Sequence, residues 1–189
     1  SNIIFPKPLK KGDTIAILSP AGNVNPEHVE YAIPVLESQG WKVIVMPHTL
    51  GHKGNYSGTI SERLADLEDA FNNPEIRAIL CSRGGYGVVH LMDSLNRLPL
   101  NDDPKWVIGY SDISALHALM STKGIASIHA SMTSHIRKGA GLAGVGCNAL
   151  CQNQFLTVNG IAVIIAHIDN NIATVDLHIS LDKHTGISI

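Results

Sequence analysis

The chain has 189 residues, of which 44% are hydrophobic and 16% are charged, and its formal net charge is −2. This length suits one globular domain with a small appendage. The near-neutral charge gives no support for nucleic acid or an anionic membrane surface as a partner, and no apolar run is long enough to span a bilayer.

In chain order, short apolar runs and helical periodicity predict a strand at 13–19, a helix at 26–39, a strand at 41–46, a helix capped by Ser61, a strand at 77–81, a helix at 88–95, a strand at 106–109, a helix at 112–122 and a strand at 126–129. Pro34 should shorten or kink the first helix. Strands that alternate with helices at this spacing indicate βαβ units and a parallel sheet.

Three turns follow the carboxyl ends of predicted strands, at residues 19–22, at 83–87 and at Ser111. In open parallel sheets, ligands bind beyond the carboxyl ends of the strands. We therefore expect these turns to lie together on one edge and to form a site.

Ser111 lies in a Gly-x-Ser turn between an apolar run and a helical pattern. This arrangement is typical of a strand-to-helix turn that exposes a nucleophilic serine, and the helix N-terminus favours developing negative charge. Ile113 stands where a second glycine is usual. The alternative is that Ser111 or Asp112 caps the helix, and Asp112 is expected to accept N–H bonds within the first helical turn.

Residues 83–87 form a Gly-rich turn that lacks the Lys-Ser/Thr pair of a phosphate loop. The functional interpretation assigns a backbone N–H of Gly84 or Gly85 to an oxyanion and Arg83 to a substrate carboxylate. The alternative is a tight structural turn with a solvated arginine. Tyr86 and Tyr110 flank the turns and are expected either to wall a substrate pocket or to pack in the core.

The sequence changes character after residue 138, because residues 139–146 are almost all small and few charges follow. Two β segments at 160–168 and 172–181, with a turn signal between them, predict a hairpin. We expect an α/β domain over residues 1–138, and a linker with a short β-rich tail over 139–189.

The three cysteines, Cys81, Cys147 and Cys151, do not form a disulfide framework, which favours a reducing cytoplasm. No signal-peptide pattern is present. Cys147 and Cys151 lack a second ligand pair, so no metal site is expected.

Four stretches of the chain, residues 9–21, 82–87, 107–117 and 128–132, resemble the LD-carboxypeptidases in the order in which that family has them. The LD-carboxypeptidases are a serine peptidase family that includes murein tetrapeptide carboxypeptidases and microcin-immunity peptidases. The resemblance covers about the first 135 residues. It implies a flavodoxin-like parallel sheet with helices on both faces, and cleavage of the bond between an L-centre and a terminal D-amino acid in murein peptides. It also implies cytoplasmic cell-wall recycling, a small murein-type peptide as partner, and no metal or organic cofactor.

By this resemblance, Ser111 is the nucleophile, and the N–H of Asp112 with one from the Gly84-Gly85 turn forms the oxyanion hole. The family's triad glutamate and histidine lie in its C-terminal domain, and the last glutamate here is Glu75. The general base is therefore unassigned, with His167, His178 and His184 as candidates.

Three interpretations of the tail follow: a truncated or frame-altered enzyme, which we favour, a triad rebuilt on a tail histidine, or a binding remnant without turnover. The rival function is a non-catalytic α/β module that binds a small peptide or a sugar. A third interpretation is an interaction domain whose tail hairpin forms a homodimer.

Overall fold

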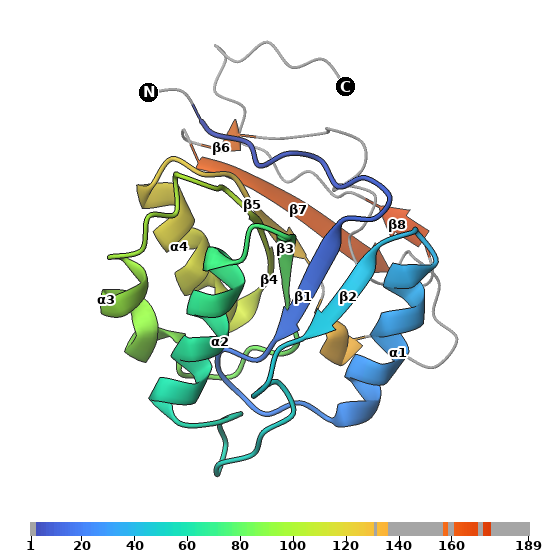
Figure 1. Cartoon of the computed structure of the whole chain (residues 1–189), viewed down its shortest axis with the longest axis vertical. Helices are drawn as coiled ribbons and strands as arrows, with labels where there is room; N and C mark the ends of the chain where they lie inside the picture. The colour runs from blue at the N-terminus through green and yellow to red at the C-terminus, as the bar shows by residue number, and fades with distance from the viewer. Residues whose placement is uncertain (1–2, 131, 136–156, 159–160, 170–171, 175–189) are drawn as a thin grey trace.

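The computed structural model describes residues 3–130, 132–135, 157–158, 161–169 and 172–174. Figure 1 shows the elements, which in chain order are β1 (Thr14–Leu18), α1 (Pro26–Glu37), β2 (Lys42–Val45), α2 (Ile60–Asn72), β3 (Ile76–Cys81), the 3-10 turn η1 (Val88–Leu91), α3 (Met92–Leu95), β4 (Trp106–Gly109), the 3-10 turn η2 (Ser111–Ile113), α4 (Ser114–Thr122), β5 (Ser127–Ala130), the 3-10 turn η3 (Thr133–His135), β6 (Thr157–Val158), β7 (Ile161–Asp169) and β8 (Ile172–Thr174).

The first five strands form a parallel sheet in the order β2-β1-β3-β4-β5. This is the order of the flavodoxin-like doubly wound fold. β1 and β4 are buried along their whole length, as strands covered on both faces must be, and their sequences are accordingly continuous apolar runs. The predicted fold class is confirmed.

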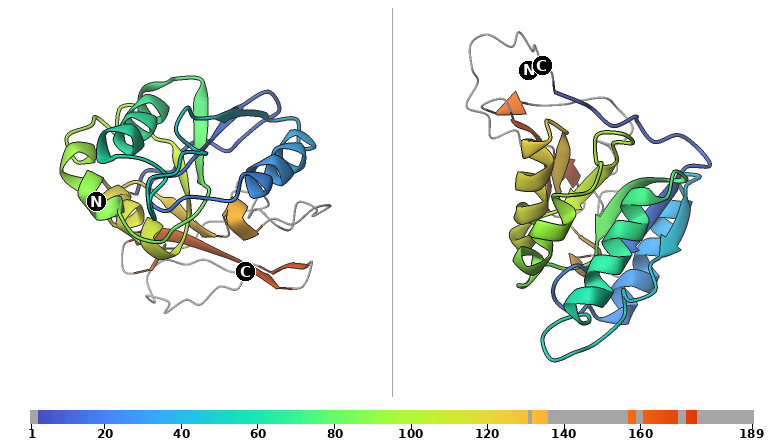
Figure 2. Two further views of the ribbon diagram at one scale, coloured as in Figure 1. Left: turned by 90° about the horizontal axis from the view of Figure 1, so that it is seen from below. Right: turned by 60° about the vertical axis from the view of Figure 1, so that its left-hand side comes forward.

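Helices cover both faces of the sheet, with α1 on one side and α2, α3 and α4 on the other (Figure 2). Alternate residues of β1 point to opposite faces. Ile15 and Ile17 pack in the cluster that contains Leu36 of α1, whereas Ala16 and Leu18 pack in the cluster that contains the side chains of α2. Among the described residues, no helix has the length and apolarity needed to cross a bilayer.

Some predicted helix ends are wrong. α2 is capped by Thr59 instead of Ser61, because Thr59 and Glu62 form a reciprocal capping box. α1 continues through Pro34, which is exposed, and ends at Glu37. The predicted helix at 88–95 divides into a 3-10 turn and a short α-helix, η1 and α3.

The tail contributes a strand to the same sheet, since β7 pairs in parallel with β5. β8 pairs antiparallel with β7, with Asp169 opposite Ile172, so the predicted hairpin is present over these residues. Residues 175–181 of the predicted second segment lie outside the described residues, as do Cys147 and Cys151. The division at residue 138 and the homodimer stay predictions.

Candidate active site

The three turns at the carboxyl edge of the sheet contact one another. The amide of Gly22, after β1, donates a hydrogen bond of 2.8 Å to the Gly84 carbonyl, after β3. A Cβ atom added to Gly84 would lie 3.3 Å from the Asp112 nitrogen and 3.4 Å from Ser111 Oγ. The Gly-rich turn and the serine turn are therefore in direct contact.

Ser111 has a backbone φ of +61°, and it is the only non-glycine residue of the described part of the chain with a positive φ. The preceding residue, Tyr110, is extended, and η2 and α4 follow directly. Neither η2 nor α4 has a side-chain cap hydrogen bond, so Ser111 does not act as an N-cap. Ser111 is exposed. The result is a sharp strand-to-helix turn that presents a hydroxyl above the sheet.

The Asp112 side chain bonds to Val88, directly after the Gly-rich turn, instead of to its own helix. Its Oδ2 accepts a hydrogen bond of 3.0 Å from the Val88 amide, which replaces the bond expected within the first helical turn. The turn at 83–87 passes beside the serine turn and brings this distant amide within reach. Asp112 therefore holds the two turns together by its side chain.

Arg63 of α2 is a buried residue of the site that the sequence analysis did not identify. Its Nη1 donates to the carbonyls of Pro20 and Gly87, at 3.0 and 2.9 Å, and its guanidinium carbon lies 4.9 Å from the centre of the Tyr56 ring. Burial lowers the pKa of Arg63, while Tyr56 and Asp112 act in the opposite direction. The sequence signal that could have identified Arg63 is its position four residues before Leu67, which places both residues on the same face of the helix.

A pocket of about 300 Å³ opens beside the Gly-rich turn and is lined by Gly22, Asn23, Asn55, Tyr56, Arg83, Gly85 and Tyr86. Arg83 Nη1 donates to the Asn23 carbonyl at 2.8 Å, which fixes the guanidinium at the rim. Tyr86 is 59% exposed, and its ring meets His90 edge-on with 5.4 Å between centroids.

Tyr110 lies apart from the lining of this pocket. Its half-buried ring stands 5.9 Å from the ring of His129. His129 lies in β5, is half-buried, and has a pKa lowered by burial. Of the residues predicted to bind substrate, the structure therefore brings Arg83 and Tyr86 together and places Tyr110 beside a different histidine.

His117 of α4 has a structural position. Its Nε2 donates to the Gly109 carbonyl at 2.8 Å, and its Nδ1 accepts from the Ser127 hydroxyl at 2.7 Å. Burial lowers the pKa of His117 to about 4. The neutral imidazole thus connects β4, α4 and β5 just before the serine turn.

None of the three candidate bases has a described side chain. His167 lies on β7, where its backbone is paired with Thr174, and His178 and His184 lie outside the described residues. Within the part of the chain that the structure describes, no three His, Cys, Asp or Glu side chains cluster as metal ligands would. Cys81 is buried, which raises the pKa of its thiol.

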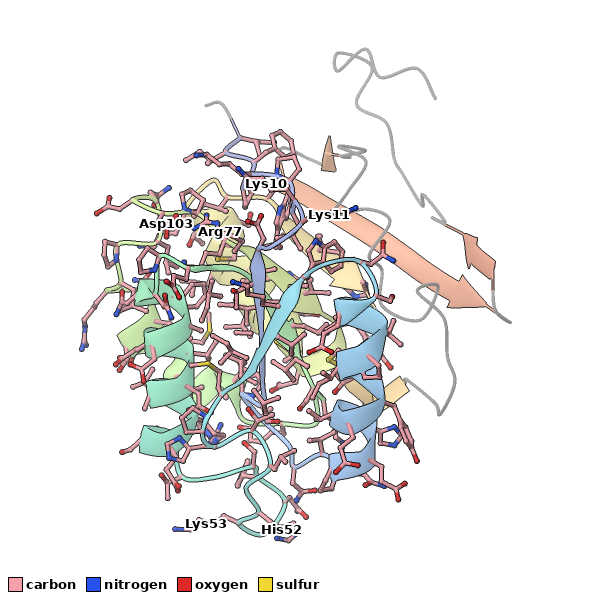
Figure 3. All side chains as sticks on the ribbon, turned by 45° about the vertical axis from the view of Figure 1, so that its right-hand side comes forward. Lys10, Lys11, His52, Lys53, Arg77 and Asp103 are labelled. Atoms are coloured by element: carbon pink, nitrogen blue, oxygen red, sulfur yellow. The ribbon has the colours of Figure 1, made fainter. Side chains whose placement is uncertain are left out.

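The opposite end of the sheet carries a separate charged network. Figure 3 shows Arg77 and Asp103 at that end, far from the loop that carries His52 and Lys53. Arg77 and Lys105 both pair with Asp103, at 2.9 and 3.0 Å. Lys105 also donates to two backbone carbonyls, so this network has a structural role.

The fold is therefore a parallel α/β sheet with an exposed serine on a positive-φ turn beyond a central strand. The sequence profile described as the LD-carboxypeptidase N-terminal domain matches residues 15–130. The chain belongs to this family.

Similar proteins agree with this assignment. A putative carboxypeptidase of Streptomyces coelicolor is 35% identical over 141 residues, which cover 71% of this chain and 45% of that protein. A probable murein peptide carboxypeptidase of Bacillus subtilis is 35% identical over 130 residues, 68% of this chain and 41% of its own length. The crystal structure of an MccF-like protein from Bacillus anthracis superposes with a TM-score of 0.61 at 33% identity, covering 69% of this chain and 41% of that one. The match thus spans less than half the length of each of these three proteins.

Proposed function

We propose that this chain supplies the nucleophile domain of a serine LD-carboxypeptidase that acts on murein peptides in the cytoplasm. The turn at Ser111 supports this proposal best, because its hydroxyl is exposed on a positive-φ backbone next to Gly84. Such a conformation costs roughly 1–3 kcal/mol and persists mainly at functional sites. The substrate class is supported by the relative named a probable murein peptide carboxypeptidase.

The proposed reaction is acyl transfer to Ser111. Its Oγ attacks the carbonyl that joins an L-centre to the terminal D-amino acid, while a general base removes the hydroxyl proton. The Asp112 amide and an amide of the Gly84-Gly85 turn donate to the tetrahedral oxyanion. The C–N bond then breaks, the D-amino acid leaves with a proton, and water hydrolyses the acyl-enzyme. The general base is unassigned, and the candidates within this chain are the tail histidines His167, His178 and His184.

Arg83 is proposed to bind the free carboxylate of the terminal D-residue. Its guanidinium is planar and has five N–H donors, so it can hold a carboxylate through two parallel bonds. The bond to the Asn23 carbonyl keeps the group at the rim of the pocket. Tyr86 forms one wall of this subsite, and Tyr110 is proposed to contact the substrate from the side of His129.

Covalent labelling tests the nucleophile. We expect a fluorophosphonate to add one adduct to the full chain, and peptide mass spectrometry to place it on Ser111. Ser111→Ala should lose the adduct, whereas Ser114→Ala, an exposed serine three residues later, should keep it. An adduct that survives Ser111→Ala, or no adduct at all, would argue against an active nucleophile. A murein tetrapeptide then tests turnover by release of the terminal residue.

A binding module without turnover is the second candidate. It is favoured by the formed pocket with a fixed Arg83. This function predicts saturable binding of the tetrapeptide, without product, that survives Ser111→Ala. Product release that is lost in the same variant would exclude it.

A further inference from the structure

Arg63 belongs to α2, yet its hydrogen bonds reach loops that surround the candidate active site. Its side chain is 2% exposed. Nη1 donates to the carbonyls of Pro20, after β1, and Gly87, after β3, and Nε donates to the carbonyl of Gly58 at 3.2 Å. One buried guanidinium therefore ties together three separate segments of the chain.

The peptide group between Gly87 and Val88 lies between two opposite charges. Its carbonyl accepts from Arg63 at 2.9 Å, and its N–H donates to Asp112 Oδ2 at 3.0 Å. A cation and a carboxylate at the two ends of one peptide dipole strengthen both hydrogen bonds. Because Asp112 follows Ser111 in the sequence, this connection runs from α2 to the serine turn.

Close packing around Gly87 limits the positions that this peptide can adopt. Gly87 has a φ of +135°, and a Cβ there would lie 2.8 Å from Arg63 Nη1 and 3.1 Å from the Tyr56 ring. The guanidinium also stacks over Tyr56, which lines the pocket. Arg63 thus contacts both the Gly-rich turn and one wall of the pocket.

We propose that Arg63 is a positioning residue for the reaction at Ser111. Through the Gly87–Val88 peptide and Asp112, it holds the Gly84-Gly85 turn in place. From there the turn can donate a hydrogen bond to the oxyanion that forms when Ser111 attacks the substrate carbonyl. This inference rests on the proposed function for its effect on rate. Its structural part, the placement of the turn, does not depend on that function.

The test compares Arg63→Met and Arg63→Lys with Lys105→Met in the full chain. Lys105 is a matched control, because it is equally buried and donates to two carbonyls and a carboxylate, but at the opposite end of the sheet. Three quantities are measured for each variant: the rate of fluorophosphonate addition to Ser111, the ¹H–¹⁵N shifts of the Gly85 and Val88 amides, and the thermal midpoint.

We expect Arg63→Met to slow addition by roughly ten- to a hundredfold, less than the roughly 10²–10³-fold loss when an oxyanion donor is removed outright, and to move both amide signals. Arg63→Lys keeps the charge without the planar fork, so it should fall between the wild type and Arg63→Met. Lys105→Met should lower the thermal midpoint but leave the rate and the two amides unchanged.

The proposal would be overturned if Arg63→Met is labelled at the wild-type rate. It would also be overturned if Lys105→Met slows fluorophosphonate addition as much as Arg63→Met does. If the wild type is not labelled, the proposed function fails, and the amides decide the inference alone: unmoved signals in Arg63→Met overturn it, and moved signals support it. If Arg63→Met does not fold, the same criteria apply to Arg63→Lys.

Discussion

Gly84 approaches Ser111 so closely that a Cβ at position 84 would stand 3.4 Å from the serine oxygen. That contact joins the turn after β3 to the turn after β4, two segments that the parallel sheet brings to the same edge. The space next to the Ser111 hydroxyl exists because residue 84 has no side chain.

Gly84→Ala should leave the chain folded and slow the reaction at Ser111. The φ of Gly84 is outside the left-handed region, so alanine causes no backbone strain there, but its methyl group would press on the Asp112 amide at 3.3 Å. We expect fluorophosphonate addition to fall about tenfold or more, with a small change in thermal midpoint. Kinetic labelling and a thermal melt measure the two effects.

Gly124→Ala provides the control for Gly84→Ala. Gly124 has open space around it but a φ of +71°, so alanine should cost about 1 kcal/mol of stability through backbone strain without affecting Ser111. If Gly124→Ala slows labelling as much as Gly84→Ala does, loss of stability explains both results and the steric argument fails.

Ser111→Gly should stabilise the chain while abolishing its reactivity. Glycine adopts a φ of +61° without a Cβ clash, and the relief of strain is expected to exceed the added chain entropy by roughly 0.5–1 kcal/mol. Chemical denaturation measures the difference in unfolding free energy. Ser114→Gly is the matched variant, because Ser114 begins α4 and has ordinary helical dihedral angles. This variant should lower the unfolding free energy. A Ser111→Gly chain that is less stable than the wild type would mean that the turn is unstrained.

The stability of the chain should fall with acid in a way that His117 controls. Burial lowers the pKa of this imidazole from 6.5 to about 4, so the unfolded chain takes up the proton at a higher pH than the folded chain. The contribution of neutral His117 to the free energy of unfolding is complete above pH 6.5 and is lost as the pH falls from 6.5 to 4. It amounts to at most about 3 kcal/mol.

Unfolding free energies at pH 7 and pH 4.5 test this contribution. We expect the difference between the two pH values to shrink in His117→Gln, which cannot take up a proton. His52→Gln is the control, because His52 lies exposed in the loop at 47–58 (Figure 3), and it should keep the wild-type difference. An unchanged difference in His117→Gln would show that other groups cause the acid sensitivity.

The sheet could be predicted from the sequence because its signals are local. Each central strand is a largely apolar run, and a turn that contains Gly or Ser follows it. The shared edge then follows from parallel connectivity. Arg63 could not be predicted, since its acceptors are backbone carbonyls 43 and 24 residues away, and an arginine on an amphipathic helix ordinarily faces solvent. The position of Asp112 at a helix start predicts bonds within that helix, whereas its partner Val88 is 24 residues away.

Arg83 should govern recognition of the substrate without affecting the reactivity of Ser111. Its guanidinium is held at the pocket by the Asn23 carbonyl, and hydrogen bonds between charged groups contribute about 1.5–3 kcal/mol each. We therefore expect Arg83→Ala to weaken binding of a murein tetrapeptide by roughly ten- to a hundredfold. A small fluorophosphonate has no carboxylate, so its rate of addition should stay at the wild-type value. Arg97→Ala, at another exposed arginine, should change neither quantity. Equal loss of peptide binding and labelling in Arg83→Ala would instead place Arg83 with Arg63 among the residues that hold the Gly-rich turn.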